Sequence, residues 1–263
     1  MSITFSSCFY ILKSKFDVGK YIYWMNNFIS IVNHFYLVIY SDKNSVQYIN
    51  TKGNPKIKIV IKPLEQFYNY RYKSFWIENH KKNLYLNEKI CWELSMVWCE
   101  KIWFVKETAQ QNYFKTDLYG WCDIGYFRNG PTDLNTFYLQ NWCKNVSVDT
   151  SKIHYACINN DTKHMNELIK SINNKNHVGL PNVPIVPNKP SIGGGFFIIE
   201  KNKINTWCHI FDQKLRVYIK FQYLVKDDQI LLADCIYTSP EHFQLHYENN
   251  NYDNWFMFQR ILN

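Results

Sequence analysis

Asp123 is the residue of this chain best placed to do chemistry. It follows directly on an uninterrupted apolar run, Leu118–Cys122, and is followed in turn by Gly125 and Arg128. Such a run is typical of a strand buried on both faces, as in a parallel sheet covered by helices. In such sheets, ligands bind beyond the carboxyl ends of the strands. Asp123 is therefore a candidate ligand for a divalent metal that a diphosphate would share. Gly125 would allow a ligand to approach the backbone closely. The alternative is that Asp123 caps a turn or pairs with Arg128.

A second candidate is Lys101, which lies on a helix predicted at residues 91–110. Its neighbours three and four positions away are all apolar: Val97, Trp98, Phe104 and Val105. An ammonium group is costly to bury unless it meets an anion or reaches water along its own aliphatic stem. Two interpretations therefore stay open: Lys101 contacts a phosphate or sugar hydroxyl, or it only extends to solvent.

Two later segments carry the remaining candidates. Gly193-Gly194-Gly195 precedes a predicted strand and has no GK[ST], so it is not a P-loop. It is either backbone left bare for a substrate or a flexible turn. Asp227-Asp228-Gln229 opens a predicted helix. Aspartate is a favoured N-cap, but one of these carboxylates could also be a general base or bind a sugar hydroxyl.

The elements that must position these residues begin with a strand, a helix and a strand, at residues 3–12, 17–32 and 35–40. That order predicts a parallel sheet with a right-handed crossover, and the lack of GxGxxG argues against a dinucleotide site. Further strands are predicted at residues 56–62, 118–122, 153–158, 196–199 and 243–247. Further helices are predicted at residues 91–110, 165–172, 205–224 and 230–237. A proline-rich loop covers residues 178–190, with Pro181, Pro184, Pro187 and Pro190 at a period of three.

Composition limits the class of protein. The 263 residues are 46% hydrophobic, enough for the core of one large α/β domain, and we find no linker that would divide residues 1–263. The net charge of +8 favours anionic partners, but without a run of five basic residues we expect no nucleic-acid binding. Abundant Asn, Lys, Ile and Tyr are typical of an AT-rich genome.

The same sequence predicts a cytoplasmic protein. The amino terminus lacks the pattern of a signal peptide, and no apolar stretch of about 18 residues predicts a membrane span. The eight cysteines include no CxxC pair, so we expect buried, reduced thiols and no zinc site.

Three blocks of the chain together resemble a bacterial family, the HtrL/YibB-like proteins, whose members are regarded as glycosyltransferases of the GT-A type. The first block runs from Leu94 to Glu107, and the second is Trp121-Cys122-Asp123-Ile124-Gly125-Tyr126-Phe127-Arg128. The third consists of Gly193–Gly195 followed by Asp228-Gln229, in the same relative order. The resemblance implies a single GT-A-like domain with a mostly parallel central sheet and helices on both faces.

The resemblance also implies roles for individual residues. Lys101, Asp123, Gly125, Arg128, Gly194, Gly195 and Gln229 would bind the donor. Asp228, with Asp227 beside it, would lie near the transferred sugar as the catalytic carboxylate. Asp123 and His246 would hold a divalent metal, Mn²⁺ or Mg²⁺. One departure is that Gly125 stands where the larger fold class has the second acid of Asp-x-Asp.

These implications define the expected function. The protein would be a metal-assisted glycosyltransferase that moves a hexose from a nucleotide sugar, with a UDP-sugar preferred, to a glycan or protein acceptor. The alternative is a non-catalytic carbohydrate- or protein-binding module on a degenerate transferase fold, which the missing second aspartate favours.

Overall fold

The computed structural model describes residues 1–187, 189 and 191–263, so Pro190 of the proline-rich loop lies outside the described residues. The strands are β1 (Ile3–Phe9), β2 (Tyr36–Ser41), β3 (Ile57–Ile61), β4 (Leu118–Cys122), β5 (Ile153–Ala156), β6 (Phe196–Glu200) and β7 (Phe243–His246). The α-helices are α1 (Val18–Ser30), α2 (Lys73–Lys82), α3 (Trp92–Gln111), α4 (Thr162–Asn173), α5 (Ile204–Lys220), α6 (Asp228–Thr238) and α7 (Met257–Ile261). Short 3-10 helices include η3 (Tyr68–Tyr72) and η4 (Thr136–Leu139).

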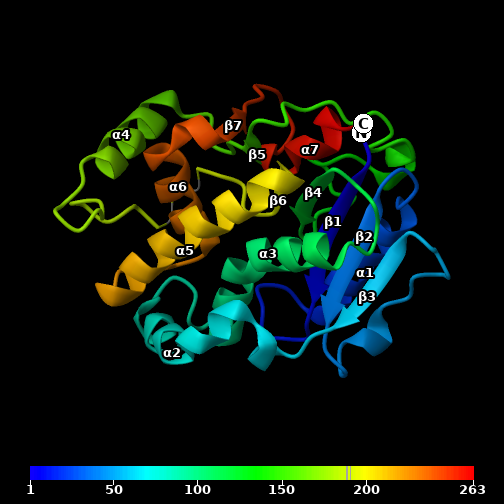
Figure 1. Cartoon of the computed structure of the whole chain (residues 1–263), viewed down its shortest axis with the longest axis horizontal. Helices are drawn as coiled ribbons and strands as arrows, with labels where there is room; N and C mark the ends of the chain where they lie inside the picture. The colour runs from blue at the N-terminus through cyan, green and yellow to red at the C-terminus, as the bar shows by residue number, and fades with distance from the viewer. Residues whose placement is uncertain (188, 190) are drawn as a thin grey trace.

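The described strands form one seven-stranded sheet in the order β3-β2-β1-β4-β6-β5-β7 (Figure 1). The pairs β1–β2, β2–β3, β1–β4 and β5–β7 are parallel, whereas β6 is antiparallel to both β4 and β5. The structure thereby confirms the predicted α/β class with a mostly parallel central sheet.

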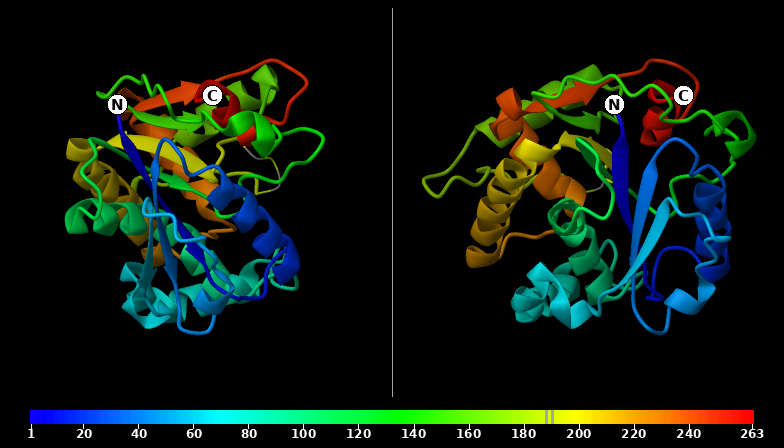
Figure 2. Two further views of the ribbon diagram at one scale, coloured as in Figure 1. Left: turned by 90° about the vertical axis from the view of Figure 1, so that its right-hand side faces the viewer. Right: turned by 45° about the vertical axis from the view of Figure 1, so that its right-hand side comes forward.

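Helices cover both faces of this sheet (Figure 2). On one face α3, α5 and α6 pack on residues such as Tyr119, Trp121 and Phe197. On the other face α1 and α7 pack on alternate residues of the same strands, such as Phe5 and Phe196. Because neighbouring residues of a strand point to opposite faces, the uninterrupted apolar run of β4 is explained by burial on both sides.

The predicted strands and helices recur in the structure with boundaries within four residues, but α2 and α7 were not predicted. Strand β1 ends at Phe9 and not at residue 12, so residues 10–12 leave the sheet at its carboxyl edge. Two helix starts follow the expected capping chemistry, because Asp17 accepts a hydrogen bond from Lys20 N and Asp161 accepts one from His164 N.

The chain ends and the cysteines complete the description. Both termini bond to one segment, since the Met1 amino group donates to Val146 O and Cys143 N donates to Leu262 O (Figures 1 and 2). All eight cysteines are free thiols. Six of them are buried, in agreement with the prediction, and Cys8 and Cys91 are partly buried. Within the described ranges, no helix combines the length and the apolar character that a membrane span requires.

Candidate ligand-binding site

A cavity opens at the carboxyl ends of the neighbouring parallel strands β1 and β4. The chain adds β2 and β3 on one side of β1 and then returns to place β4 on the other side. Such a reversal of strand order is where open α/β sheets bind ligands. The lining residues come from the end of β1, the segment after it, α1, α3 and the end of β4: Cys8, Phe9, Tyr10, Ile11, Leu12, Ser14, Val18, Tyr21, Leu94, Val97, Trp98, Lys101, Trp121, Asp123, Ile124, Gly125 and Arg128.

Lys101 is the centre of a buried cluster on the wall of this cavity. Its Nζ lies 3.1 Å from Asp123 Oδ1, 2.9 Å from Asp228 Oδ2 and 2.7 Å from the carbonyl oxygen of Gly194. The ammonium group donates a hydrogen bond to Gly194 O and forms ion pairs with the two carboxylates. The structure argues against the interpretation in which Lys101 only extends to solvent, because its ammonium group meets two carboxylates of the protein itself. The contact with a phosphate or sugar hydroxyl stays a prediction.

The ionisation of the cluster follows from burial opposed by ion pairing. Burial alone would lower the pKa of the Lys101 ammonium, but the carboxylates of Asp123 and Asp228 outweigh it and raise that pKa above its ordinary value. Burial raises the pKa of Asp228 to about 6, against the opposing effect of Lys101. Lys101 therefore stays charged at neutral pH.

Asp123 is the carboxylate of the cluster that reaches the cavity. Its Oδ1 accepts a hydrogen bond from Trp121 Nε1 at 2.5 Å and forms an ion pair with Lys101. Its backbone N–H donates to Gly195 O at 2.8 Å. The side chain is 32% exposed, and no described residue donates a hydrogen bond to Oδ2. Asp123 thus presents one fixed and one free oxygen, as a ligand-facing carboxylate should.

At three glycines of the site a side chain would crowd a neighbouring group. A Cβ on Gly194 would lie 2.6 Å from Asp228 Oδ2, and one on Gly195 would lie 3.2 Å from Asp123 Oδ2 and 3.1 Å from Trp255 Nε1. A Cβ on Gly125 would lie 2.8 Å from the Trp24 ring. Gly194 and Gly195 therefore make room for the two carboxylates, while Gly125 makes room for a core indole as well as lining the cavity.

Arg128 lies at the rim of the cavity. Its Nε donates to Gly125 O at 3.0 Å, and its guanidinium lies 4.5 Å from the centroid of the Trp24 ring. In the described part of the chain no carboxylate pairs with it, so the expected alternative of an Asp123–Arg128 pair is not seen. Its two terminal amino groups remain available for an anion.

Asp227, Asp228 and Gln229 lie at the start of α6, where Asp228 joins the Lys101 cluster. Asp227 occupies the N-cap position of α6, but its side chain does not cap the helix and its Oδ2 lies 2.9 Å from Lys226 Nζ. None of the three lines the cavity at β1 and β4. Asp228 instead lines a small apolar space on the far side of Lys101. Of these three predicted site residues, the structure brings only Asp228 to Lys101.

His246 lies apart from Asp123. β6 and β5 separate β7 from β4, so the two strands are about 14 Å apart at a spacing of about 4.8 Å per strand. His246 Nε2 lies 3.0 Å from His154 Nδ1, and its ring packs on Phe258, on the sheet face opposite α3. Burial and the neighbouring His154 lower the pKa of His246 to about 4. The structure does not bring the two expected metal ligands together.

The residues present do not form a protein cage for a divalent metal. Among the described residues, no three His, Cys, Asp or Glu side chains gather in a way that could hold one. The point between the carboxylates of Asp123 and Asp228 is filled by the Lys101 ammonium. Asp123 Oδ2 alone is left, which is too little to hold a metal without other ligands.

Sequence reasoning missed several residues of the site. Tyr10, Ile11, Leu12 and Ser14 line the cavity because β1 ends early, and Trp121 fixes Asp123 from two positions upstream. Tyr21 and Trp98 face the cavity from α1 and α3. The only signal in the sequence was that Trp98 lies one turn before Lys101.

Fold and site together define an α/β protein consistent with the Rossmann or GT-A-like type, with a ligand cavity where the strand order reverses. The chain belongs to the HtrL_YibB family, described as a bacterial protein of unknown function, whose model matches residues 13–263. A comparison with curated proteins found no match.

Proposed function

We propose that this protein is a nucleotide-sugar-dependent glycosyltransferase that transfers a hexose to a glycan or protein acceptor, with a UDP-sugar as the preferred donor. The observation that carries the proposal is the cavity at the ends of β1 and β4, with the partly exposed carboxylate of Asp123 at its wall. Ligands of open parallel sheets bind at such a reversal of strand order.

The size and lining of the cavity suit the base of the donor. The cavity has a volume of about 130 Å³, and an apolar cavity of about 150 Å³ accepts one benzene molecule. It therefore has room for one planar ring, with Tyr21 and Trp98 available for aromatic contacts. The diphosphate and the sugar would then lie outside it, toward Arg128, Asp123 and the glycines of the β6 approach.

The chemistry of sugar transfer needs the charge on the departing nucleoside diphosphate to be balanced. Arg128 offers free guanidinium donors at the rim, and a bidentate contact to phosphate is the geometry that guanidinium favours. Asp123 Oδ2 is the free carboxylate oxygen for a donor sugar hydroxyl. In this assignment Lys101 is a positioning residue, because its ammonium group is already held by Asp123, Asp228 and Gly194.

The proposal is tested by binding and turnover over a panel of UDP- and GDP-sugars, each with and without Mn²⁺. We expect one donor to raise the melting temperature and to be hydrolysed slowly, and Asp123→Asn to abolish both effects. Asp117→Asn is the matched control, since Asp117 is exposed just before β4 begins, at the opposite end of the same strand. No thermal shift and no turnover with any donor would refute the proposal.

The geometry also favours a second candidate, a non-catalytic carbohydrate-binding module. Asp123 is the only carboxylate among the described residues that line the cavity, and neither Asp227 nor Asp228 reaches it. The described lining of the cavity therefore contains no second carboxylate that could act as the general base for transfer. Glycan binding that persists without nucleotide, and that Asp123→Asn weakens, would favour this function over the first.

A further inference from the structure

We propose that the Lys101 ammonium takes the place of a divalent cation in this site, so that the protein binds a diphosphate through Arg128 without a metal. The part of this inference that concerns the diphosphate rests on the proposed function. The part that concerns Lys101 rests on the contacts of the cluster alone.

The first support is the set of atoms that surrounds the ammonium. Asp123 Oδ1, Asp228 Oδ2 and Gly194 O converge on one point from three separate parts of the chain. Carboxylate and carbonyl oxygens are the ligands that hard divalent cations prefer. The chain has thus built an oxygen-lined cation site and has filled it with its own lysine, which is only 8% exposed.

The second support is the size of the site. The three oxygens lie 2.7 to 3.1 Å from Nζ, which suits an ammonium hydrogen bond. Mg²⁺ requires about 2.0–2.1 Å, so these oxygens would have to close in while the lysine left. A buried lysine anchored by two carboxylates opposes that exchange, because its departure leaves the ammonium without partners.

The third support is the free cation at the rim. Arg128 has no carboxylate partner in the described chain, and three aromatic rings, those of Phe16, Trp24 and Phe256, lie within 5.5 Å of its guanidinium. Lys15, which precedes Phe16 in the chain, has its ammonium group 5.0 Å from the ring of Trp98 on the cavity wall. The positive charge that a diphosphate needs is therefore supplied by side chains.

Mn²⁺ titration of the protein alone, followed by electron paramagnetic resonance, tests the role of Lys101. We expect the wild-type protein to leave Mn²⁺ free in solution. Lys101→Met exposes the three oxygens and should bind Mn²⁺ at least about tenfold more tightly, a gain of about 1.4 kcal/mol. Lys101→Met/Asp228→Asn should lose that gain. A tight Mn²⁺ site in the wild-type protein that Asp123→Asn removes and Asp117→Asn retains would overturn the inference, even if Lys101→Met does not fold.

Calorimetric titration with UDP tests the second half. We expect the same affinity in EDTA and in Mn²⁺, and we expect Arg128→Met to weaken binding about tenfold or more. Arg216→Met is the matched control, because Arg216 pairs with Asp212 on α5 and does not line the cavity. UDP binding that requires Mn²⁺ would refute metal-free binding and leave the proposed function standing. If no nucleotide or nucleotide sugar binds under any condition, the proposed function fails, while the Mn²⁺ titration still decides the role of Lys101.

Discussion

At the scale of single residues, the site depends on one buried lysine. Taking an ammonium out of water is costly unless the protein returns the lost interactions. Lys101 regains them from two carboxylates and a carbonyl, and the bare backbone at Gly194 lets Asp228 come close enough to take part. Sequence reasoning could name Lys101 as anomalous, but it could not say which anion the ammonium meets.

Replacing Lys101 with methionine should strongly destabilise the fold. The change leaves Asp123 and Asp228 without their shared cation, and breaking a buried pair typically costs about 3–5 kcal/mol of unfolding free energy. Lys101→Met/Asp228→Asn should recover part of the loss. Urea unfolding of the single and double variants measures both effects. Lys106→Met on the same helix is the control, and equal losses for Lys101→Met and Lys106→Met would contradict the central role of Lys101.

At the scale of elements, strand ends decide what becomes site and what becomes core. β1 and β4 end side by side on the same edge, which brings residues 8–12 and Ser14 to the same cavity as Asp123. β7 pairs in parallel with β5 at the far end of the sheet, and this places His246 beside His154. The histidine expected to bind metal is therefore part of a partly buried imidazole pair between two strands.

This pair should make stability fall in mild acid. Burial lowers the pKa of His154, and burial together with His154 lowers that of His246 to about 4. In the unfolded chain both groups titrate near the ordinary value of about 6.5. Between pH 6.5 and 4 the unfolded state binds more protons, so stability is present above pH 6.5 and is lost as the pH falls through this window.

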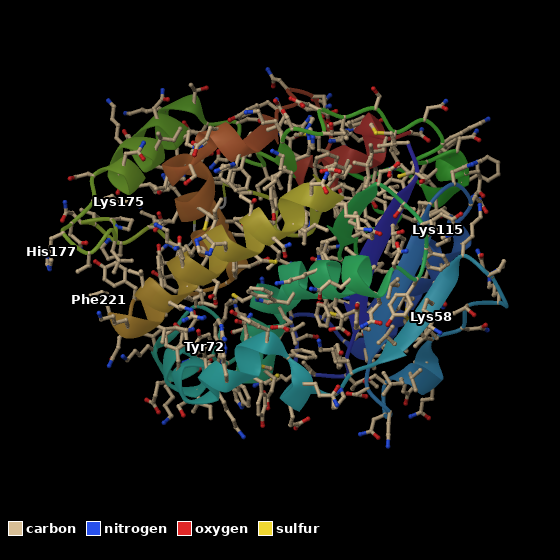
Figure 3. The ribbon with its side chains drawn as sticks, in the orientation of Figure 1. Lys58, Tyr72, Lys115, Lys175, His177 and Phe221 are labelled. Carbon is tan, nitrogen blue, oxygen red and sulfur yellow. The ribbon has the colours of Figure 1, made fainter. Side chains whose placement is uncertain are left out.

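Urea unfolding at pH 7 and pH 5 measures the effect. We expect His246→Gln to reduce the difference between the two pH values. His177→Gln should leave it unchanged, because His177 is exposed on a loop at the periphery (Figure 3). An unchanged pH dependence in His246→Gln would show that the pair does not contribute.

At the scale of the whole molecule, one sheet joins two cores. The core under α3, α5 and α6 and the core under α1 and α7 share strands β1, β2, β4, β5 and β6, whose residues alternate between the two faces. Loss of either core would expose a full face of the same sheet. The two cores should therefore not unfold independently.

The expected outcome is a single cooperative transition. Tryptophan fluorescence, far-ultraviolet circular dichroism and amide hydrogen exchange should give one midpoint in urea, as two-state domains do. The probes report on both faces, since Trp76 and Trp207 belong to one core and Trp142 to the other. Two separate midpoints would contradict the single-domain description.

The sequence by itself determined the class of fold and most of the elements, because hydrophobic period acts over one or two turns of chain. The apolar run of β4 and the strand–helix–strand opening agree with the structure, whereas α2 and α7 were not predicted. The sequence also singled out Asp123, since an acid that ends a buried strand must lie at the sheet edge.

Tertiary structure alone decided which candidates meet. Lys101, Asp123 and Asp228 come together because α3 packs against β4 and α6, and Lys101 and Asp228 are more than one hundred positions apart in the chain. His246 is separated from them because strand order, which depends on the packing of whole elements, places β7 at the far edge. Periodicity is a local signal and carries no information on that order, and so residue types alone could not distinguish the lysine-filled site from a metal site.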